Sequence, residues 1–248
     1  MGPKLMRALV TRAEPDGQAT VQRLAALDIA AVAAPLMSRR TLETSLPPAQ
    51  GFAALALSSA NGLRALADRG VVEQYRALPV FAVGGRTALE ARSMGFADVV
   101  DAGGTLGDLA NRLAHARLQG PVFYPAGKHL SGDLAKSLAP FGVMVVTARL
   151  YDMVPVDHLP EAVVSGLQSG DIDAVLLYSR RTAELFVQAL EGRLDRTQRS
   201  RIAMLCLSEA VAEPAMAAHF NRVSLADYPS EEAMMALALA VTRERNRP

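Results

Sequence analysis

From residue 79 the chain reads Pro79-Val80-Phe81-Ala82-Val83-Gly84-Gly85-Arg86-Thr87 and then continues with helical spacing of apolar residues to Met94. Its apolar run does not alternate with polar residues, which is typical of a strand buried on both faces of a parallel sheet. The two glycines let the backbone turn sharply between strand and helix. The segment therefore predicts one strand–turn–helix unit of an α/β protein.

The same unit recurs along nearly the whole chain. The predicted strands are Met6–Thr11, Ile29–Ala34, Ala53–Ser58, Pro79–Val83, Asp98–Val100, Pro121–Pro125, Val143–Arg149, Asp173–Tyr178, Arg201–Cys206 and Arg222–Ser224. The predicted helices are Gly17–Leu27, Asn61–Arg69, Arg86–Met94, Leu106–Arg117, Leu130–Leu138, Leu159–Gln168, Arg181–Leu190, Glu209–Ala217 and Glu231–Thr242. This alternation predicts two five-stranded parallel sheets with helices on both faces, the doubly wound α/β class with flavodoxin-like or Rossmann-like domains.

The chain also repeats itself weakly. Equivalent segments lie 114 residues apart near the start, 120 in the middle and 124 further on. The matched pairs are Leu9-Val10-Thr11 with Phe123-Tyr124-Pro125, Leu57-Ser58-Ser59 with Leu177-Tyr178-Ser179, and Val83-Gly84-Gly85 with Leu207-Ser208-Glu209. A drifting offset indicates two copies of one unit whose loops differ in length.

The two copies do not coincide with the two expected domains. Residues 6–34 supply only two strands before Pro35 and the Pro47-Pro48 pair interrupt regular structure. Because a doubly wound sheet needs about five strands, later parts of the chain must complete the first domain. We expect a first domain of residues 1–36 with 155–248, a second of residues 41–149, and crossings at 36–41 and 149–155.

Composition limits the functional class. The 248 residues are 50% hydrophobic and carry a formal net charge of +1, which argues against a disordered chain and against a dedicated nucleic-acid-binding protein. The single cysteine, Cys206, excludes a disulfide framework. The four histidines show no metal-ligand spacing, and no apolar run approaches the length of a membrane span. With no signal-peptide pattern, these features predict a cytoplasmic protein without metal or membrane contact.

Several motifs, taken in order, resemble the uroporphyrinogen-III synthase family over essentially the whole chain. They are Leu9-Val10-Thr11-Arg12, Leu57-Ser58-Ser59-Ala60-Asn61-Gly62, Val80–Ala88, Val122–Gly127 and Arg149-Leu150-Tyr151. The resemblance implies two similar α/β domains joined by a two-stranded linker, the first domain containing both chain ends. It also implies closure of the linear tetrapyrrole hydroxymethylbilane with inversion of the last pyrrole ring, by a monomer that uses no metal and no organic cofactor. Transient contact with hydroxymethylbilane synthase is a further expectation.

Polar turns at the predicted carboxyl ends of strands suit that substrate, which carries eight carboxylates. Helix N-termini offer backbone N–H groups to anions, and hydroxyls and cations can assist them. The candidate substrate-binding residues are Thr11, Arg12, Ser58, Ser59, Asn61, Gly84, Gly85, Arg86, Thr87, Gly127, Lys128, Ser179, Arg180, Arg181 and Ser208. His129, beside Lys128, is a further candidate for a carboxylate contact. Helix capping explains many of these residue types equally well, so that alternative stays open.

Tyr151 is the candidate catalytic residue, because the family motif turns this tyrosine toward the substrate. Its phenol would donate a proton to the departing hydroxyl, hydrogen-bond the substrate, or only pack the linker. The chain departs from the family pattern at Val211, where relatives carry a hydroxyl, and at Glu209, an acid in an expected anion-binding turn.

Three rival functions remain at this point. The first is a two-domain small-molecule binding protein resembling periplasmic receptors, and the second is a tandem pair of flavodoxin-like regulatory modules. The third is a synthase fold reused for regulation without catalysis. The absence of a signal peptide counts against the first, and strand ends that carry Ser, Thr and Gly rather than an acidic cluster count against the second.

Overall fold

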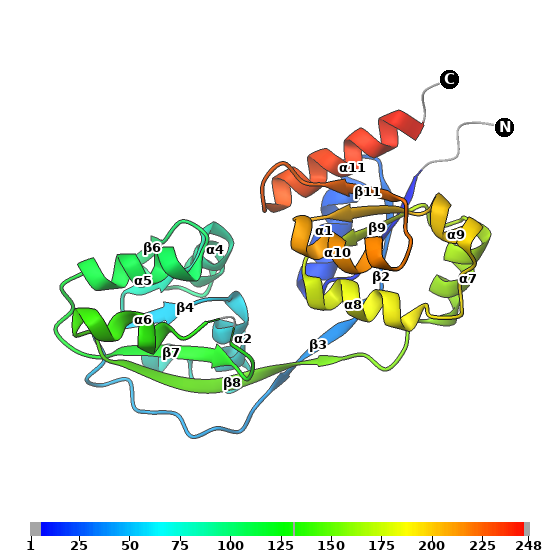
Figure 1. Ribbon diagram of the computed structural model, residues 1–248. Helices are drawn as coiled ribbons and strands as arrows, with labels where there is room; N and C mark the ends of the chain where they lie inside the picture. The colour runs from blue at the N-terminus through cyan, green and yellow to red at the C-terminus, as the bar shows by residue number, and fades with distance from the viewer. Residues whose placement is uncertain (1–5, 131, 246–248) are drawn as a thin grey trace. The chain divides into compact units, whose positions relative to one another are not determined.

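A computed structural model describes residues 6–130 and 132–245. The chain forms two compact units. Unit 1 comprises Met1–Ser38 and Val154–Pro248, and unit 2 comprises Arg39–Met153. Each has its own sheet, and helices cover both faces of each sheet (Figure 1).

Unit 1 contains a five-stranded sheet in the order β11-β10-β9-β1-β2, in which each strand is parallel to its neighbours. Its strands are β1 (Arg7–Val10), β2 (Ala30–Ala33), β9 (Ala174–Leu177), β10 (Ala203–Cys206) and β11 (Arg222–Leu225). One face packs against α1 (Asp16–Ala25) and α11 (Glu231–Arg245). The other packs against α7 (Glu161–Ser169), α8 (Arg180–Ala189) and α10 (Glu209–Ala217). The central strands β9 and β10 are buried at every position because both faces are covered, as unbroken apolar runs predict.

Unit 2 contains a six-stranded sheet in the order β3-β8-β7-β4-β5-β6. Its strands are β3 (Met37–Thr41), β4 (Ala54–Leu57), β5 (Val80–Ala82), β6 (Val99–Asp101), β7 (Val122–Gly127) and β8 (Val145–Pro155). One face packs against α2 (Ala60–Asp68), α3 (Val72–Tyr75) and α4 (Gly85–Ser93). The other packs against α5 (Leu106–His115) and α6 (Leu134–Leu138).

The strand orders of the two sheets agree with the sequence repeat. The repeat pairs β1 with β7, β2 with β8, β9 with β4, β10 with β5 and β11 with β6. With these substitutions the order β11-β10-β9-β1-β2 becomes β6-β5-β4-β7-β8, which is the order found in unit 2 once β3 is set aside. Equivalent segments thus occupy equivalent places in the two sheets.

The structure confirms the doubly wound α/β class and corrects details of it. The second sheet has six strands rather than five, because Met37–Thr41 joins it as β3 and β8 extends to Pro155. The polar run Ser38-Arg39-Arg40-Thr41 gave no strand signal, since an edge strand needs no apolar pattern on its outer side. The short helices α3 and α9 (Arg196–Arg201) were not predicted from the sequence. The helix predicted from Leu130 begins at Leu134, because Asp133 caps it by accepting a hydrogen bond from the Lys136 N–H at 3.0 Å.

Among the described helices, none has the length and apolar character that crossing a bilayer demands.

Candidate active site

Each sheet has one place where the strand order changes direction. It lies between β9 and β1 in unit 1 and between β4 and β7 in unit 2. Ligands of open α/β sheets bind outside the carboxyl ends of the strands at such a switch point. The helices that follow these strands also begin there, with unpaired N–H groups and the positive end of the helix dipole. The polar turns predicted from the sequence lie at these two edges.

Ser58 and Tyr124 connect the two strands beside the switch point of unit 2. The Oγ atom of Ser58 and the phenol oxygen of Tyr124 lie 2.7 Å apart. Burial raises the pKa of Tyr124, and the hydrogen bond with Ser58 lowers it in part, so this phenol stays neutral. Tyr124 was not predicted as a site residue, because an aromatic residue inside a strand carries no signal beyond core packing.

The start of α2 uses its polar side chains locally. The Ser59 Oγ atom caps the helix by accepting a hydrogen bond from the Asn61 N–H at 3.2 Å. The Asn61 side chain accepts a hydrogen bond from Arg64 at 3.3 Å, and its amide nitrogen lies 3.7 Å from the Met153 sulfur. Both of these predicted residues therefore serve the fold, and neither side chain is fully buried.

Tyr151 faces the core beside the carboxyl end of β7 because of a bulge in β8. Ala126 pairs with Arg149, but Gly127 pairs with Tyr151, so Leu150 is an extra residue in the strand. The Tyr151 side chain is only 8% exposed and packs in the core with its ring over Gly127. A Cβ atom added at Gly127 would lie 3.0 Å from the ring, so this glycine is required for a close approach.

The ionisation of Tyr151 bears on its proposed chemistry. Burial raises the pKa of Tyr151, and a hydrogen bond with Ser59 lowers it only in part. A phenol with a raised pKa keeps its proton and donates a hydrogen bond, but it is a poor source of a transferred proton near neutral pH. The geometry therefore suits Tyr151 better as a neutral hydrogen-bond donor than as a general acid.

A group of charged residues beside Tyr151 was not predicted as a set. The Asp152 carboxylate is buried, with its side chain 7% exposed. It lies 3.4 Å from the Lys128 ammonium, 3.8 Å from the Arg40 guanidinium and 3.8 Å from the His129 ring. Only Lys128 and His129 were candidates beforehand, because Arg40 and Asp152 lie on strands far apart in the sequence.

The start of α4 presents backbone rather than side chains. Gly84 is its N-cap, in an extended conformation, and Gly85 is its first residue. Arg86 is exposed, whereas the Thr87 side chain is only 6% exposed. Of the residues predicted in this turn, Gly85 is exposed and Gly84 is half-buried, and Thr87 contributes mainly to packing.

At the switch point of unit 1 a carboxylate of the chain itself is already bound. Arg12 forms an ion pair with Glu231, the first residue of α11, and donates a hydrogen bond to Thr20 at 3.1 Å. Thr20 in turn donates to Glu231 at 2.8 Å. The Arg12 guanidinium also stacks on the Tyr178 ring, 4.1 Å from its centroid. Burial, and then the negative charge of Glu231, raise the pKa of Tyr178. Arg12 was predicted to bind substrate, but its side chain is engaged here within the fold.

The other residues predicted in unit 1 fall into buried and exposed sets. The Thr11 hydroxyl is buried and donates to the Leu176 carbonyl at 2.8 Å. Ser179 caps α8 by accepting from the Thr182 N–H at 3.1 Å. Arg180 and Arg181 are exposed at the start of α8.

The starts of α8 and α10 differ in how their polar side chains are used. Arg180 forms ion pairs with Glu184 at 3.0 Å and with Glu213. Ser208 is the N-cap of α10 and makes no side-chain capping bond. Val211 is buried in the core of unit 1, and Glu209 is exposed in the first turn of α10. The hydroxyl absent at position 211 would therefore have faced packed side chains, and Glu209 is placed to stabilise the helix dipole.

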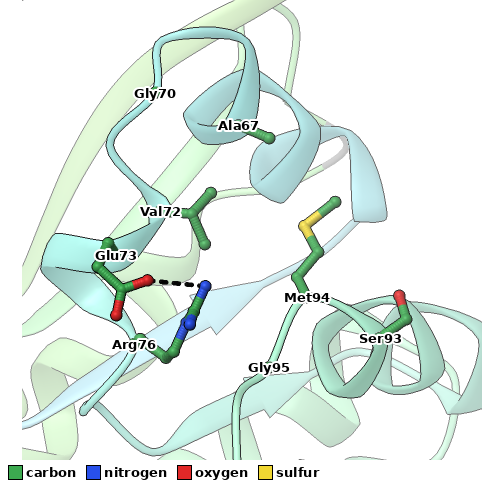
Figure 2. Close-up of a pocket in the computed structure, with 8 residues that line it drawn as sticks. All are labelled: Ala67, Gly70, Val72, Glu73, Arg76, Ser93, Met94 and Gly95. Atoms are coloured by element: carbon green, nitrogen blue, oxygen red, sulfur yellow. Dashed lines mark ion pairs between the residues drawn. The ribbon is translucent and has the colours of Figure 1, made fainter.

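A pocket of about 630 Å³ lies at the opposite edge of the sheet in unit 2. It is lined by the ends of α2 and α4 and by α3, and an ion pair of 2.8 Å joins Glu73 and Arg76 along its wall (Figure 2). Helix C-termini present carbonyl groups rather than N–H groups, so this pocket does not suit a polycarboxylate. Among the described residues there is also no group of three or more His, Cys, Asp or Glu side chains that would hold a metal ion.

The family model described as uroporphyrinogen-III synthase HemD matches residues 18–236. No curated protein matches the sequence significantly. Among solved structures, the chain is similar to uroporphyrinogen-III synthetase from Helicobacter pylori 26695, at 17% identity and a TM-score of 0.65, with 96% of this chain and 99% of that chain covered. It is also similar to a mutant uroporphyrinogen III synthase from Thermus thermophilus, at 17% identity and a TM-score of 0.52, with 98% and 100% covered. At this identity the structures show the fold alone, but the family model covers most of the sequence. The chain belongs to the uroporphyrinogen-III synthase family.

Proposed function

We propose that this chain closes hydroxymethylbilane to uroporphyrinogen III, and that polar groups at the carboxyl ends of its strands bind the carboxylates of this substrate. The family consists of cyclising lyases of haem biosynthesis, and the reaction loses water. The bond between the terminal carbon and its hydroxyl oxygen breaks, and the terminal carbon bonds to the last ring at the carbon that already carries the preceding bridge. The bond from that ring carbon to the bridge then breaks and re-forms at the ring's free carbon, which inverts the ring. The free carbon loses its hydrogen as a proton, and this proton and the departed hydroxide together make the water that is released. Electrons are neither gained nor lost overall, so the proposed reaction needs no redox cofactor.

The observation that carries this proposal is the position of Tyr151 at the switch point of unit 2. Its neutral phenol lies beside the Ser58–Tyr124 pair and the N-terminus of α2. We assign to Tyr151 a hydrogen bond to the departing hydroxyl oxygen, or to the ring that carries it, rather than transfer of its own proton. Holding a flexible chain in one geometry supplies a large part of the acceleration of a ring closure.

The remaining predicted residues divide by accessibility. We propose that exposed cations and backbone N–H groups at helix starts hold substrate carboxylates, because both stay accessible at the sheet edges. The exposed cations are Arg86, Lys128, Arg180 and Arg181, and the helix starts are at Ser59, Gly84, Gly85, Ser179 and Ser208. Thr11, Thr87 and Gly127 would contact the substrate through their backbone groups. Ser58, Asn61 and Arg12 would keep the turns at the strand ends in place through their hydrogen bonds within the fold.

We further propose that the protein works in the cytoplasm as a monomer, with the unstable bilane passing to it from hydroxymethylbilane synthase during transient contact. The single cysteine suits a reducing compartment. The rival reading, a binding protein that releases its ligand unchanged, is not favoured by membership of the synthase family.

The test is incubation of the purified chain with hydroxymethylbilane, followed by oxidation and separation of the porphyrin isomers. The ring-inverted type III isomer is expected to predominate. Type I alone, the product of spontaneous closure, would contradict the proposed activity.

A further inference from the structure

Asp152 is a buried carboxylate whose three basic neighbours are all exposed. The side chains of Lys128, Arg40 and His129 are 53%, 64% and 66% exposed, against 7% for Asp152. A buried carboxylate is costly unless charged or hydrogen-bonding groups compensate it. Here the compensating groups lie on the solvent side, so they cover Asp152 and face outward at the same time.

The bulge in β8 accounts for this placement. Ala148 and Leu150 face the core, and after the extra residue Tyr151 and Met153 face the core as well. Because one added residue reverses the alternation of a strand, Tyr151 faces the core where Asp152 would otherwise face it, and Asp152 is turned to the other face. The bulge thus decides that the Tyr151 phenol packs in the core and that the Asp152 carboxylate lies on the other face of β8.

The backbone of Lys128 is held in place from two sides. Its N–H donates to the Tyr151 carbonyl at 2.7 Å, and its carbonyl accepts a hydrogen bond from the Arg149 guanidinium. The turn after β7 is therefore attached to β8 on both sides of the bulge. These two hydrogen bonds fix the backbone from which the Lys128 and His129 side chains extend.

The cations around Asp152 exceed the charge that it can neutralise. Lys128 and Arg40 carry one positive charge each, and a protonated His129 would add a third, against one carboxylate. Their distances of 3.4–3.8 Å are longer than good hydrogen bonds, so donor N–H groups remain for another acceptor. Arg39 differs from Arg40 in this respect, because it donates to Asp68 at 2.6 Å and to Thr41 at 2.9 Å.

We propose that Arg40, Lys128 and His129 form a subsite for one carboxylate of the polycarboxylate substrate, and that Asp152 is its positioning residue. The inference rests on the proposed function, which it deepens by naming a subsite. Asp152 does not touch the substrate in this scheme. It gathers the two cations of β3 and the β7 turn into one place, which water-exposed side chains would not keep by themselves.

The experiment measures binding of uroporphyrin I, an unreactive octacarboxylate, by fluorescence titration of the full chain at several salt concentrations. Lys128→Met and Arg40→Met are each expected to weaken binding about 5-fold and to reduce its dependence on salt, since each removes a charge-assisted contact. Lys136→Met is the matched control, because it removes an exposed ammonium of the same unit within α6. It should leave binding within about 2-fold of wild type.

Asp152→Asn separates positioning from simple electrostatics. It adds a net positive charge, so an electrostatic effect alone would tighten binding of the octacarboxylate. We expect binding to weaken about 3-fold or more, and the KM for hydroxymethylbilane to rise with little change in kcat. Tighter or unchanged binding would overturn the positioning role, and unchanged binding in both cation variants would overturn the subsite. Thermal unfolding of each variant checks that the fold is kept.

Failure of the subsite and failure of the proposed function give different results. If wild type forms type III isomer while the cation variants bind uroporphyrin I normally, the subsite is wrong and the function stands. If wild type forms only type I while those variants bind weakly, the function is wrong and a polycarboxylate site remains.

Discussion

Gly127→Ala tests whether the approach of Tyr151 to the backbone of β7 shapes the candidate site. The new Cβ atom would lie 3.0 Å from Cε2, 3.1 Å from Cζ and 3.2 Å from the hydroxyl oxygen of Tyr151. Overpacking of this kind costs about 1–3 kcal/mol, and the reduced freedom of the unfolded chain returns about 0.4–1 kcal/mol. We therefore expect a net loss of about 1–2 kcal/mol in the free energy of unfolding, together with lower turnover as the phenol is displaced.

A double-mutant cycle isolates this contact. The cost of Gly127→Ala is measured by urea unfolding in wild type and in a Tyr151→Leu background, followed by circular dichroism because the chain has no Trp. Without the ring the cost should fall by about 1 kcal/mol or more. Gly107→Ala in α5 is the control, since its Cβ would meet only the Thr105 hydroxyl at 3.6 Å, and it should be neutral or stabilising by up to about 1 kcal/mol. Equal costs of Gly127→Ala in both backgrounds would refute the steric reasoning.

Three further predictions concern single residues. Tyr151→Phe should lower kcat several-fold with KM nearly unchanged, since it removes one hydrogen bond worth about 1 kcal/mol in the transition state; an unchanged kcat would exclude that bond. Glu231→Gln should destabilise unit 1 by about 1–3 kcal/mol, because the Arg12 side chain, which is 12% exposed, loses its nearer carboxylate partner and is left with the Asp16 carboxylate at 3.9 Å; an unchanged Tm would show that the pair contributes nothing. Burial raises the pKa of the Cys206 thiol to about 12 from 9.0, so the folded state keeps the proton that the unfolded chain releases above about pH 9. Stability should therefore fall by about 1 kcal/mol between pH 9 and 10 in wild type, and by less in Cys206→Ala; equal pH dependence in the two proteins would count against this.

The architecture could be predicted because burial on both faces leaves a strong signal in sequence. Strands such as Ala174–Leu177 and Ala203–Cys206 are continuous apolar runs between helical stretches, so their type and order follow directly. The edge strand Met37–Thr41 has no such run, and its membership of the sheet depends on pairing with a strand more than 100 residues away. Local pattern carries no information about that pairing.

The candidate site was predicted in its location more than in its contacts. Turns at the carboxyl ends of strands place Ser59, Gly84 and Ser179 at helix starts, as their residue types indicate. The partners of charged side chains could not be predicted, because the sequence does not show that Glu231 reaches Arg12 or that Asp152 lies among three basic side chains. The bulge at Leu150 was equally hidden, although it decides which way Tyr151 and Asp152 face.

The most direct test of the proposed activity is the fraction of type III isomer formed from hydroxymethylbilane as the concentration of the purified chain is raised. Because spontaneous closure competes with catalysis, the fraction should rise from near zero toward completion as enzyme is added. It should rise less steeply for Tyr151→Phe than for wild type. A fraction that stays at the uncatalysed level at every enzyme concentration would contradict ring-inverting closure by this chain.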